Sequence, residues 1–314
     1  MIDQTTITAL PYCAAVDWGT TQFRLWLLDH QGVVLNEHQN DRGMSTLQSA
    51  DYDAVLTKAL EIVGAPAQLP VIICGMAGSA SGWLEAPYAD LPVRPDNIVQ
   101  AAVRVPNSDR DIRILPGLAQ RDAAHPDVMR GEETLLLGLM HSGANTGLFC
   151  LPGTHSKWVQ LENGLVTRFR TVMTGELFAL LSRHSTLAHA IKDTDTISPE
   201  ANEFETAVAE ALAAPEAVTS ALFSVRAGPL LGLSAADQMA GRLSGLLIGL
   251  EIAGMGLSPS TQVTLVSQGS LGTLYDRAIS SAGHRVDLVD SNDNVRIGLL
   301  AAAHSLWPAK DLSQ

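Results

Sequence analysis

The sequence has few cysteines and no metal-binding spacing of cysteine and histidine. Only Cys13, Cys74 and Cys150 occur in 314 residues, far apart and each within or beside an apolar stretch. Three widely spaced thiols argue against a disulfide framework and predict reduced core cysteines in a cytosolic protein. Because no CxxC or HxxxH spacing occurs, a metal site built on these residue types is not expected.

Basic runs are also missing. The formal net charge is -13, and no stretch of lysine and arginine interrupts it. Such a chain repels nucleic acid and anionic membrane surfaces, so we expect small molecules as its partners. A phosphate site in this protein must rely on backbone amides, a bound cation and a few placed basic residues.

Long apolar runs are absent as well. The start, MIDQTTITALPY, has neither a basic segment nor an apolar core, so it is not expected to be a signal peptide. The most apolar stretch, Leu243 to Leu257, is interrupted by Glu251 and contains four glycines. It is too short to span a bilayer and predicts a packed helix. With 46% hydrophobic and 17% charged residues, the composition is that of a globular protein long enough for two domains.

One pattern occurs twice. AAVDWGTTQFRLWLLD begins at Ala14, and LFCLPGTHSKWVQLEN begins at Leu148. When Gly19 is aligned with Gly153, each segment shows an apolar run, a Gly-Thr turn and a second apolar run. A glycine turn lets backbone N–H groups approach a phosphate, because no Cβ stands in the way. Two such turns, one in each half of the chain, predict a nucleotide triphosphate held from two sides.

The duplication extends beyond the turns, since each half begins with three strands and continues with alternating helix and strand. In the first half we expect strands at 13–17, 23–28, 33–38, 71–75 and 112–115 and helices at 53–63 and 132–141. In the second half we expect strands at 147–151, 157–161, 166–172, 263–267 and 285–288 and helices at 176–183, 271–282 and 294–306. This order predicts an α/β fold with mixed five-stranded sheets flanked by helices.

The domain boundary is expected near 143–147, where glycine, asparagine and threonine cluster. Domains at 1–144 and 145–314 follow, with the last helix able to pack back on the first domain. The second half carries an additional Ala- and Leu-rich block at about 185–261, which we expect to be helical. Within it, Ser234 is a candidate N-cap for a helix that runs to about Gly254.

The first turn offers a metal ligand. Asp17 ends a buried strand, where a carboxylate is unusual unless it holds a cation or bonds to the turn. One interpretation makes it a water-mediated Mg²⁺ ligand, with Thr20 and Thr21 as donors to phosphate oxygens. The other interpretation is an ordinary Asx-type turn. The repeat at Gly153 favours the first.

The second turn has no acid, because Leu151 stands where Asp17 stood, so we expect it to bind phosphate without metal. Thr154, His155 and Ser156 follow Gly153 in this turn. Lys157 either neutralises phosphate charge or is an ordinary solvated lysine. His155 is treated as a turn residue with no catalytic role.

Small residues follow the strand at 71–75. Gly75, Met76, Ala77, Gly78 and Ser79 allow either a ligand or a helix to approach the backbone at the carboxyl end of that strand. Trp83, Glu85 and Tyr88 come next, and an aromatic, acid-bearing loop suits a polyol-like substrate.

Charged residues precede the helix at 132–141. Glu132 and Glu133 are typical of a first helical turn, or one of them is a general base toward a substrate hydroxyl. Arg130 is then a candidate for a substrate carboxylate or for the transferred phosphoryl group.

Two more helix starts are candidate ligand sites. Thr174 is a candidate N-cap, and with Gly175 and Glu176 it opens a helix whose N-terminus could also bind an anion. Gly269 and Ser270 lie in a turn that either passes under an adenosine or simply connects strand and helix.

Together these features resemble the actin-like ATPase and sugar-kinase superfamily, in which two duplicated ribonuclease-H-like domains close on ATP and Mg²⁺. More closely, the chain resembles the 2-dehydro-3-deoxygalactonokinase family. The resemblance is carried by six segments: VDWGTTQFRLWL, GMAGSASGWLEAPY, MRGEETLLLG, LPGTHSKWVQ, FRTVMTGELFALLSRHS and SGLLIGLEIA.

The resemblance implies a cytoplasmic kinase that phosphorylates the C6 hydroxyl of 2-dehydro-3-deoxy-D-galactonate in D-galactonate catabolism, with ATP and Mg²⁺. The implied catalytic residues are Asp17, which positions Mg²⁺, and Glu132 or Glu133. Nucleotide contacts are implied for Gly19, Thr20, Thr21, Arg24, Gly153, Thr154, His155, Ser156, Lys157, Gly269 and Ser270. Substrate contacts are implied for Gly75, Met76, Ala77, Gly78, Ser79, Trp83, Arg130, Thr174 and Glu176, with Arg168 and Arg170 as further candidates for the carboxylate.

The sequence departs from the superfamily at two places: it has SQGSLG where many members have paired glycines, and glutamates where many have an aspartate base. Two alternatives stay open. The chain could phosphorylate another sugar acid, such as 2-dehydro-3-deoxy-D-gluconate. It could also be a non-enzymatic nucleotide switch, although the loop with Trp83, Glu85 and Tyr88 and the nearby Arg130 suit a small polar ligand.

Overall fold

The structure is a computed structural model that describes residues 10–191, 197 and 202–308. The expectation that the chain starts without a signal peptide falls mainly on residues 1–9, outside this range. Contacts divide the chain into two compact units. Unit 1 comprises Met1–Thr146, Glu162–Arg168 and Asn292–Gln314, and unit 2 comprises Gly147–Leu161 and Phe169–Ser291.

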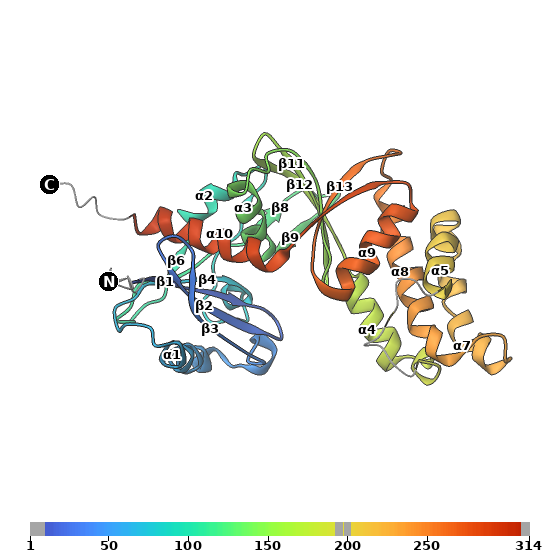
Figure 1. The fold of residues 1–314 in the computed structure, drawn as a ribbon, viewed down its shortest axis with the longest axis horizontal. Helices are drawn as coiled ribbons and strands as arrows, with labels where there is room; N and C mark the ends of the chain where they lie inside the picture. The colour runs from blue at the N-terminus through green and yellow to red at the C-terminus, as the bar shows by residue number, and fades with distance from the viewer. Residues whose placement is uncertain (1–9, 192–196, 198–201, 309–314) are drawn as a thin grey trace, which may run out of the picture. The chain divides into compact units, whose positions relative to one another are not determined.

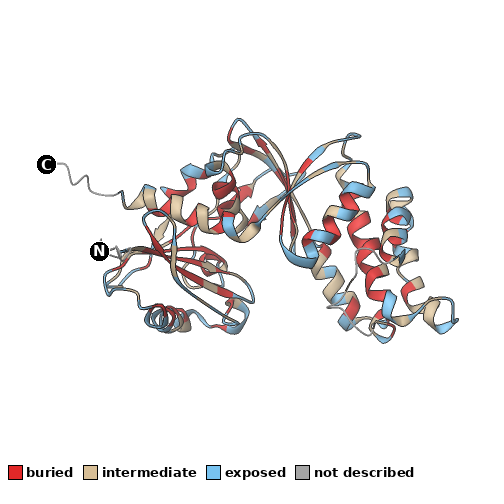
Figure 2. Cartoon of the chain, viewed as in Figure 1, coloured by how far each residue is buried: buried red, intermediate tan, exposed pale blue. Residues whose placement is uncertain are grey.

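Unit 1 contains a mixed sheet whose strand order is β3-β2-β1-β4-β7-β6. The bounds are β1 Pro11–Trp18, β2 Phe23–Asp29, β3 Val34–Asn40, β4 Val71–Gly75, β6 Val103–Arg104 and β7 Ile112–Ile114. β1, β2 and β3 form an antiparallel meander, and β4 pairs with β1 in parallel. The central strands are almost wholly apolar because helices cover both faces of the sheet, and they are buried in Figure 2.

Helix α1 (Tyr52–Val63) lies on one face of this sheet, and α3 (Glu132–His141) and α10 (Ser291–Leu306) lie on the other (Figure 1). The axes of α3 and α10 approach closely at two glycines. A Cβ on Gly138 would stand 1.9 Å from the carbonyl oxygen of Asn294, and a Cβ on Gly298 would stand 2.1 Å from that of Thr134. Glycine at both positions therefore fixes how α10 packs on α3.

Short elements that the sequence did not predict complete unit 1. They are α2 (Pro95–Val99) and a small sheet of β5 (Ala89–Asp90), β8 (Leu118–Gln120) and β9 (Asp127–Met129). Strands of two or three residues are too short to show an alternating pattern. The first main sheet also has one strand more than expected, because β6 adds to its edge.

Unit 2 repeats the strand order of unit 1. Its sheet runs β12-β11-β10-β13-β14, with bounds β10 Gly147–Leu151, β11 Ser156–Glu162, β12 Leu165–Val172, β13 Gln262–Val266 and β14 Arg285–Val289. β10 pairs antiparallel with β11 and parallel with β13, as β1 does with β2 and β4. The predicted duplication and mixed α/β class are confirmed.

The helices of unit 2 follow the expected pattern. They are α4 Thr174–His184, α5 Asn202–Ala213, α6 Val218–Ala221, α7 Ser224–Leu230, α8 Met239–Met255 and α9 Gly269–Ser281. Short 3-10 helices of unit 2 lie at Thr186–His189, Pro215–Ala217 and Ala236–Gln238, and those of unit 1 lie at Met44–Thr46, Ser49–Asp51 and Met76–Gly78. The described part of the additional block at about 185–261 is mainly helical, as predicted.

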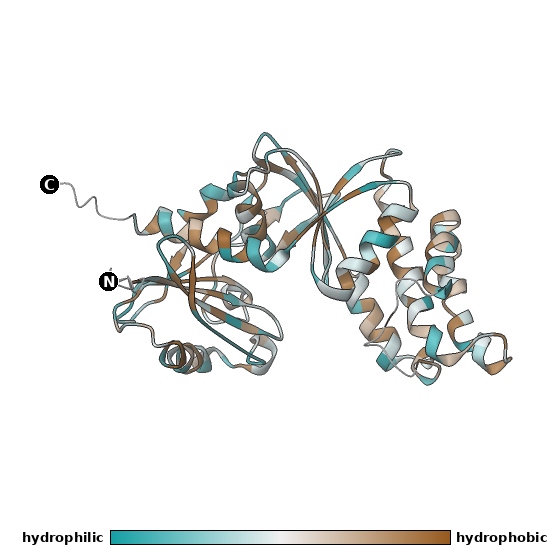
Figure 3. Ribbon diagram, viewed as in Figure 1, coloured by the Kyte–Doolittle hydropathy of each residue, from teal (hydrophilic) through white to brown (hydrophobic). Residues whose placement is uncertain are grey.

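Helix α8 is the predicted packed helix, and its apolar residues stand out in Figure 3. Three of its glycines face α5, and a Cβ on one of them, Gly245, would stand 2.5 Å from the Phe204 carbonyl oxygen. The predicted N-cap Ser234 is wrong, because a 3-10 turn precedes α8 and its N-cap is Gln238. The Ser234 side chain instead lies beside Gly228. No helix among the described residues is long and apolar enough to cross a membrane.

Candidate active site

Asp17 and Arg24 form an ion pair at the first turn. The two residues face each other in the register of β1 and β2, and the distance from Arg24 Nη2 to Asp17 Oδ2 is 2.5 Å. The other end of the Arg24 guanidinium donates to the side-chain oxygen of Asn292. The predicted metal ligand thus has a counter-ion, and the predicted phosphate ligand Arg24 is directed toward that carboxylate.

The first turn is held by its carbonyl groups. Met44 N donates to Gly19 O at 3.0 Å, and Ser45 N donates to Thr20 O at 2.9 Å. A Cβ on Gly43 would stand 2.3 Å from the backbone of Thr21, so the supporting loop packs directly on the turn. The backbone N–H groups of Thr20 and Thr21, both exposed, make no hydrogen bond among the described residues. They are donors available to an anion.

The surroundings of Asp17 fit a magnesium ion that is bound mainly by water and phosphate. The described residues hold no group of three or more histidine, cysteine or acidic side chains that could enclose a metal. Gly75 is the last residue of β4 and has φ of +89°, and a Cβ there would stand 3.5 Å from Asp17 Oδ1. The glycine leaves room above the carboxylate. One carboxylate with open space is a donor set that Mg²⁺ accepts when a nucleotide supplies further oxygens.

The second turn rests on the N-terminus of α4. Glu176 N donates to Thr154 O at 2.9 Å, and His155 Nε2 lies 2.6 Å from Glu176 Oε2. A Cβ on Gly175 would stand 2.4 Å from Gly153 O, so only glycine permits this contact. As in the first turn, the backbone N–H groups of Thr154 and His155 bond to no described residue. Unbonded turn amides beside a helix N-terminus are groups of the kind with which proteins bind anions.

Two side chains predicted to bind phosphate are buried. Ser156 Oγ lies 2.7 Å from the hydroxyl of Tyr275, and Lys157 Nζ donates to His155 O at 3.2 Å. Both side chains therefore pack beneath the surface of unit 2, next to the second turn, and their polar atoms bond to the protein itself.

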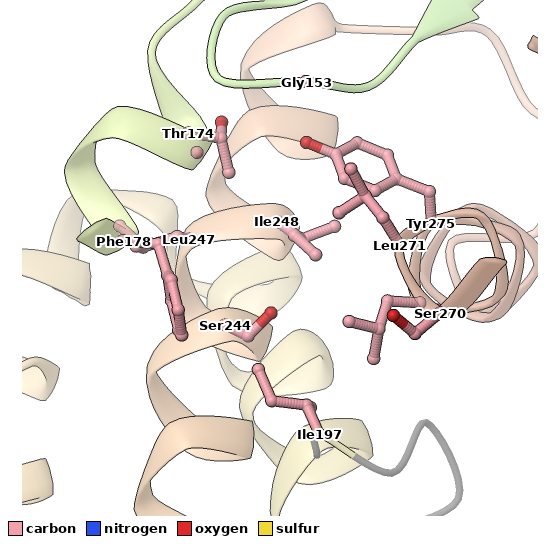
Figure 4. Close-up of a pocket in the computed structure, with 12 residues that line it drawn as sticks. Gly153, Thr174, Phe178, Ile197, Ser244, Leu247, Ile248, Ser270, Leu271 and Tyr275 are labelled. Atoms are coloured by element: carbon pink, nitrogen blue, oxygen red, sulfur yellow. The ribbon is translucent and has the colours of Figure 1, made fainter. Parts of the chain in front are cut away.

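A cavity of about 180 Å³ opens beside the second turn, within unit 2 (Figure 4). Its lining residues are Gly153, Thr174, Gly175, Phe178, Ile197, Ser244, Leu247, Ile248, Ser270, Leu271, Leu274 and Tyr275. The turn supplies a polar edge, while α8 and α9 supply apolar walls. Of the two residues predicted for adenosine, Ser270 lines the cavity, and Gly269 begins α9 with φ of +62°.

The predicted N-cap role of Thr174 is wrong. Thr174 is the first residue of α4, and the N-cap is Met173, which makes no side-chain cap bond. The Thr174 hydroxyl instead donates to Glu251, a buried acid on α8. Burial raises the pKa of Glu251, and hydrogen bonds from Thr174, Tyr275 and Trp158 oppose that rise. In the sequence, Glu251 was noticeable only because it interrupts an apolar run, and no pattern indicated its partners.

Glu132 and Glu133 begin α3 but differ in exposure. Glu133 is fully buried, accepts a hydrogen bond from Gly131 N at 2.7 Å, and has its pKa raised to about 8 by burial and by the nearby Glu132. Glu132 is partly exposed and accepts from Arg130 N at 3.1 Å. A fully buried carboxyl cannot touch a substrate in this conformation, whereas Glu132 can be reached from solvent.

The loop after β4 surrounds Arg130. The Arg130 guanidinium donates to Ala86 O at 2.8 Å and stacks 4.4 Å above the ring of Tyr88, while a Cβ on Gly78 would stand 2.9 Å from Arg130 Nη1. Its Nε and Nη1 atoms are buried without a partner among the described residues. The small residues predicted for this loop therefore make room for an arginine.

The remaining residues predicted for substrate binding lie around the same loop. Met76, Ala77 and Gly78 form a 3-10 turn, and the hydroxyl of Ser79 donates to the sulfur of Met44. Trp83 is partly buried and stacks on Tyr52, with ring centroids 5.9 Å apart.

Arg168 and Arg170 occupy alternate positions on β12. Arg168 lines a cavity of about 600 Å³ in unit 1, together with Asp90, Arg121, Asp122 and His125 among others. Arg170 donates to Gly254 O at 2.8 Å in unit 2. Arg170 is thus already bonded to a carbonyl group.

Comparison with known proteins supports a single family. The profile of 2-keto-3-deoxy-galactonokinase matches residues 17–302. A probable 2-dehydro-3-deoxygalactonokinase of Rhizobium meliloti (strain 1021) is 51% identical over 306 residues, covering 96% of this chain and all of the relative. The 2-dehydro-3-deoxygalactonokinase of Escherichia coli (strain K12) is 35% identical, covering 93% of this chain and 97% of the relative.

A solved structure agrees with the sequence comparisons. The crystal structure of a putative 2-dehydro-3-deoxygalactonokinase from Sinorhizobium meliloti superposes with a TM-score of 0.90 at 50% identity, covering 95% of this chain and all of that one. The likeness extends over both units. The chain belongs to the 2-keto-3-deoxy-galactonokinase family.

Proposed function

We propose that this protein transfers the γ-phosphoryl group of ATP to the C6 hydroxyl of 2-dehydro-3-deoxy-D-galactonate. The observation that carries the proposal is the 51% identity to a relative of that name over the full length of the relative. The paired turns with available amides agree with a kinase, because phosphoryl transfer depends on positioning and charge neutralisation. The same identity disfavours the alternative of a non-enzymatic nucleotide switch.

In this proposal the two turns bind the phosphates of one ATP through the amides of Thr20, Thr21, Thr154 and His155. The cavity beside the second turn accepts the adenosine, because its walls are apolar and Ser270 adds a polar edge. A bound Mg²⁺ near Asp17 would neutralise phosphate charge. Arg24 holds the Asp17 carboxylate in the position from which it would bind the ion.

Glu132 is the proposed general base. It begins α3, is accessible, and is fixed by the Arg130 amide, so it can accept the proton of the C6 hydroxyl. Glu133 holds the turn at Gly131 in place and is largely protonated at neutral pH, given its raised pKa.

For the substrate carboxylate we propose Arg130. Among the three candidate arginines it alone has buried Nε and Nη1 donors without a described partner, whereas Arg170 is bonded to a carbonyl. The loop from Gly75 to Tyr88 would shift slightly to admit the acid. We also propose that the protein acts in the cytoplasm, since its three cysteines are free and buried.

A substrate panel tests the proposal. The purified protein is mixed with ATP and Mg²⁺ and with 2-dehydro-3-deoxy-D-galactonate, its D-gluconate epimer, or a simple sugar, and ADP release is followed. We expect strong release with the galactonate compound and a product whose phosphorus couples to the C6 protons in NMR. Faster release with the epimer or a simple sugar would reassign the substrate, and release independent of every acceptor would refute the kinase.

A further inference from the structure

Glu251 is a buried carboxylate in the middle of the apolar helix α8. Glu251 is only 3% exposed to solvent, and its neighbours along the helix are mainly apolar. Burying a carboxylate is unfavourable unless hydrogen bonds replace the lost water. The position of Glu251 therefore depends on its partners.

Three donors from three different elements converge on this carboxylate. Trp158 Nε1 of β11 donates to Oε1 at 2.7 Å, and the Tyr275 hydroxyl of α9 donates to Oε2 at 2.7 Å. The hydroxyl of Thr174, the first residue of α4, also donates to Oε2. One side chain of α8 thus connects a strand and two helices.

The same donors form part of the cavity beside the second turn. Thr174 and Tyr275 line that cavity, and both are drawn in Figure 4. The Tyr275 hydroxyl also shares a hydrogen bond with Ser156, which directly follows the turn. Glu251 itself is not among the lining residues. It can influence a ligand in the cavity only through the residues that it holds.

We propose that Glu251 is a positioning residue for the nucleotide. Its carboxylate sets the spacing between the second turn, the start of α4 and the α9 wall, so that turn amides and cavity fit one nucleotide. This inference rests on the proposed function, because it takes ATP as the ligand of this cavity. All residues of the network belong to unit 2, whereas the loop proposed for the sugar acid belongs to unit 1, so the effect is confined to ATP.

Four variants test the proposal. Glu251→Leu removes all three hydrogen bonds. Tyr275→Phe removes one of them, together with the bond to Ser156, while keeping the ring in the cavity wall. Glu251→Gln is the conservative variant, since its amide oxygen can accept from Trp158 and its NH₂ group can donate to the two hydroxyls. Tyr52→Phe is the matched control, because the buried Tyr52 hydroxyl in unit 1 has no partner among the described residues.

The measurements are calorimetric titration of each full-length variant with ATP and Mg²⁺, the KM for each substrate, and the Tm. We expect ATP affinity to fall roughly fivefold in Tyr275→Phe, and roughly tenfold or more in Glu251→Leu, as unmade buried hydrogen bonds predict. Glu251→Gln should stay within about threefold of wild type and Tyr52→Phe should match it, with the KM for the sugar acid unchanged throughout.

Three results would overturn the inference. One is wild-type ATP affinity in a folded Tyr275→Phe variant, which decides the matter even if Glu251→Leu does not fold. Another is a parallel fall of ATP and sugar-acid affinity in step with Tm, which would show a purely structural role. If the wild-type protein binds no ATP, the proposed function fails and the inference fails with it, so the wild-type titration separates the two.

Discussion

At the scale of single residues, candidate site residues such as Asp17 lie where a polar side chain occurs at the end of an apolar strand. Asp17 was found in the sequence because a carboxylate at the end of a buried strand requires a partner. The sequence did not show which partner, because Arg24 reaches Asp17 only through strand pairing, and Asn292 bonds to Arg24 only through the return of α10. Likewise, Glu132 and Glu133 were equivalent in the sequence, and only their burial separates them.

Asp17→Asn should lower turnover about 100-fold or more, because the neutral amide is a much weaker partner for Mg²⁺. Stability should change by about 1 kcal/mol at most, because the partly exposed Arg24 can rehydrate. Steady-state kinetics and urea unfolding measure the two effects. Asp41→Asn, which changes an exposed acid bonded to Gln22 near the same turn, is the control and should keep full activity. Equal turnover in both variants would remove Asp17 from the metal site.

Glu132→Gln and Glu133→Gln should differ sharply. The first removes the proposed base and should lower kcat by about 10²–10⁴, the range of a lost general base. The second keeps the acceptor for Gly131 N and should leave kcat within about tenfold of wild type. Single-turnover kinetics with saturating ATP measures the chemical step. The reverse order of effects would make Glu133 the base and would require α3 to open.

Glu133 also makes stability depend on pH. Its pKa rises from 4.5 to about 8 on folding, so the folded state holds the proton more strongly than the unfolded state. The stabilisation is present at low pH and is lost as pH rises through 8. Between pH of about 5.5 and 8.5, the unfolding free energy of wild type should fall by about 3 kcal/mol more than that of Glu133→Gln. The unfolding free energies are measured with urea at both pH values. An equal pH dependence in wild type and Glu133→Gln would contradict the burial of this acid.

At the scale of elements, the long strands and helices were predictable and the short ones were not. β1, β2, β4 and α3 are apolar runs of five or more residues in the sequence, and their observed bounds lie close to the predicted ones. β5 and β9 are too short to carry a pattern, and they depend on tertiary pairing. Ser234 and Thr174 failed as N-caps because their side chains lie against Gly228 and Glu251 instead. Side chains that cap in isolation are thus redirected by packing.

The contact between the second turn and α4 gives a prediction about an element. Gly175→Ala places a Cβ 2.4 Å from Gly153 O, so the turn must move away from the helix start. ATP affinity should fall about tenfold, as loss of roughly one charge-assisted hydrogen bond implies. The control is Gly254→Ala in α8, where a Cβ meets nothing within 4 Å. Calorimetric titration that finds equal ATP affinity in both variants would show that this contact does not shape the site.

At the scale of the whole molecule, the duplication was visible in the sequence and is confirmed by the shared strand order of the two sheets. Its asymmetry was visible only in part. The sequence showed that the second turn lacks the acid, but not that the turns are supported differently. The loop of Gly43 and Met44 supports the first, whereas the start of α4 supports the second. Those supports lie more than 20 residues from the turns in the sequence, so no local pattern reports them.

The central claim is that both turns bind the same nucleotide. Amide hydrogen exchange of the full-length protein, followed while ATP and Mg²⁺ are titrated, tests it most directly. The account predicts that peptides containing Thr20–Thr21 and Thr154–His155 become protected together, at one midpoint ATP concentration. Protection of one turn alone, or protection of the two at separate midpoints, would contradict it.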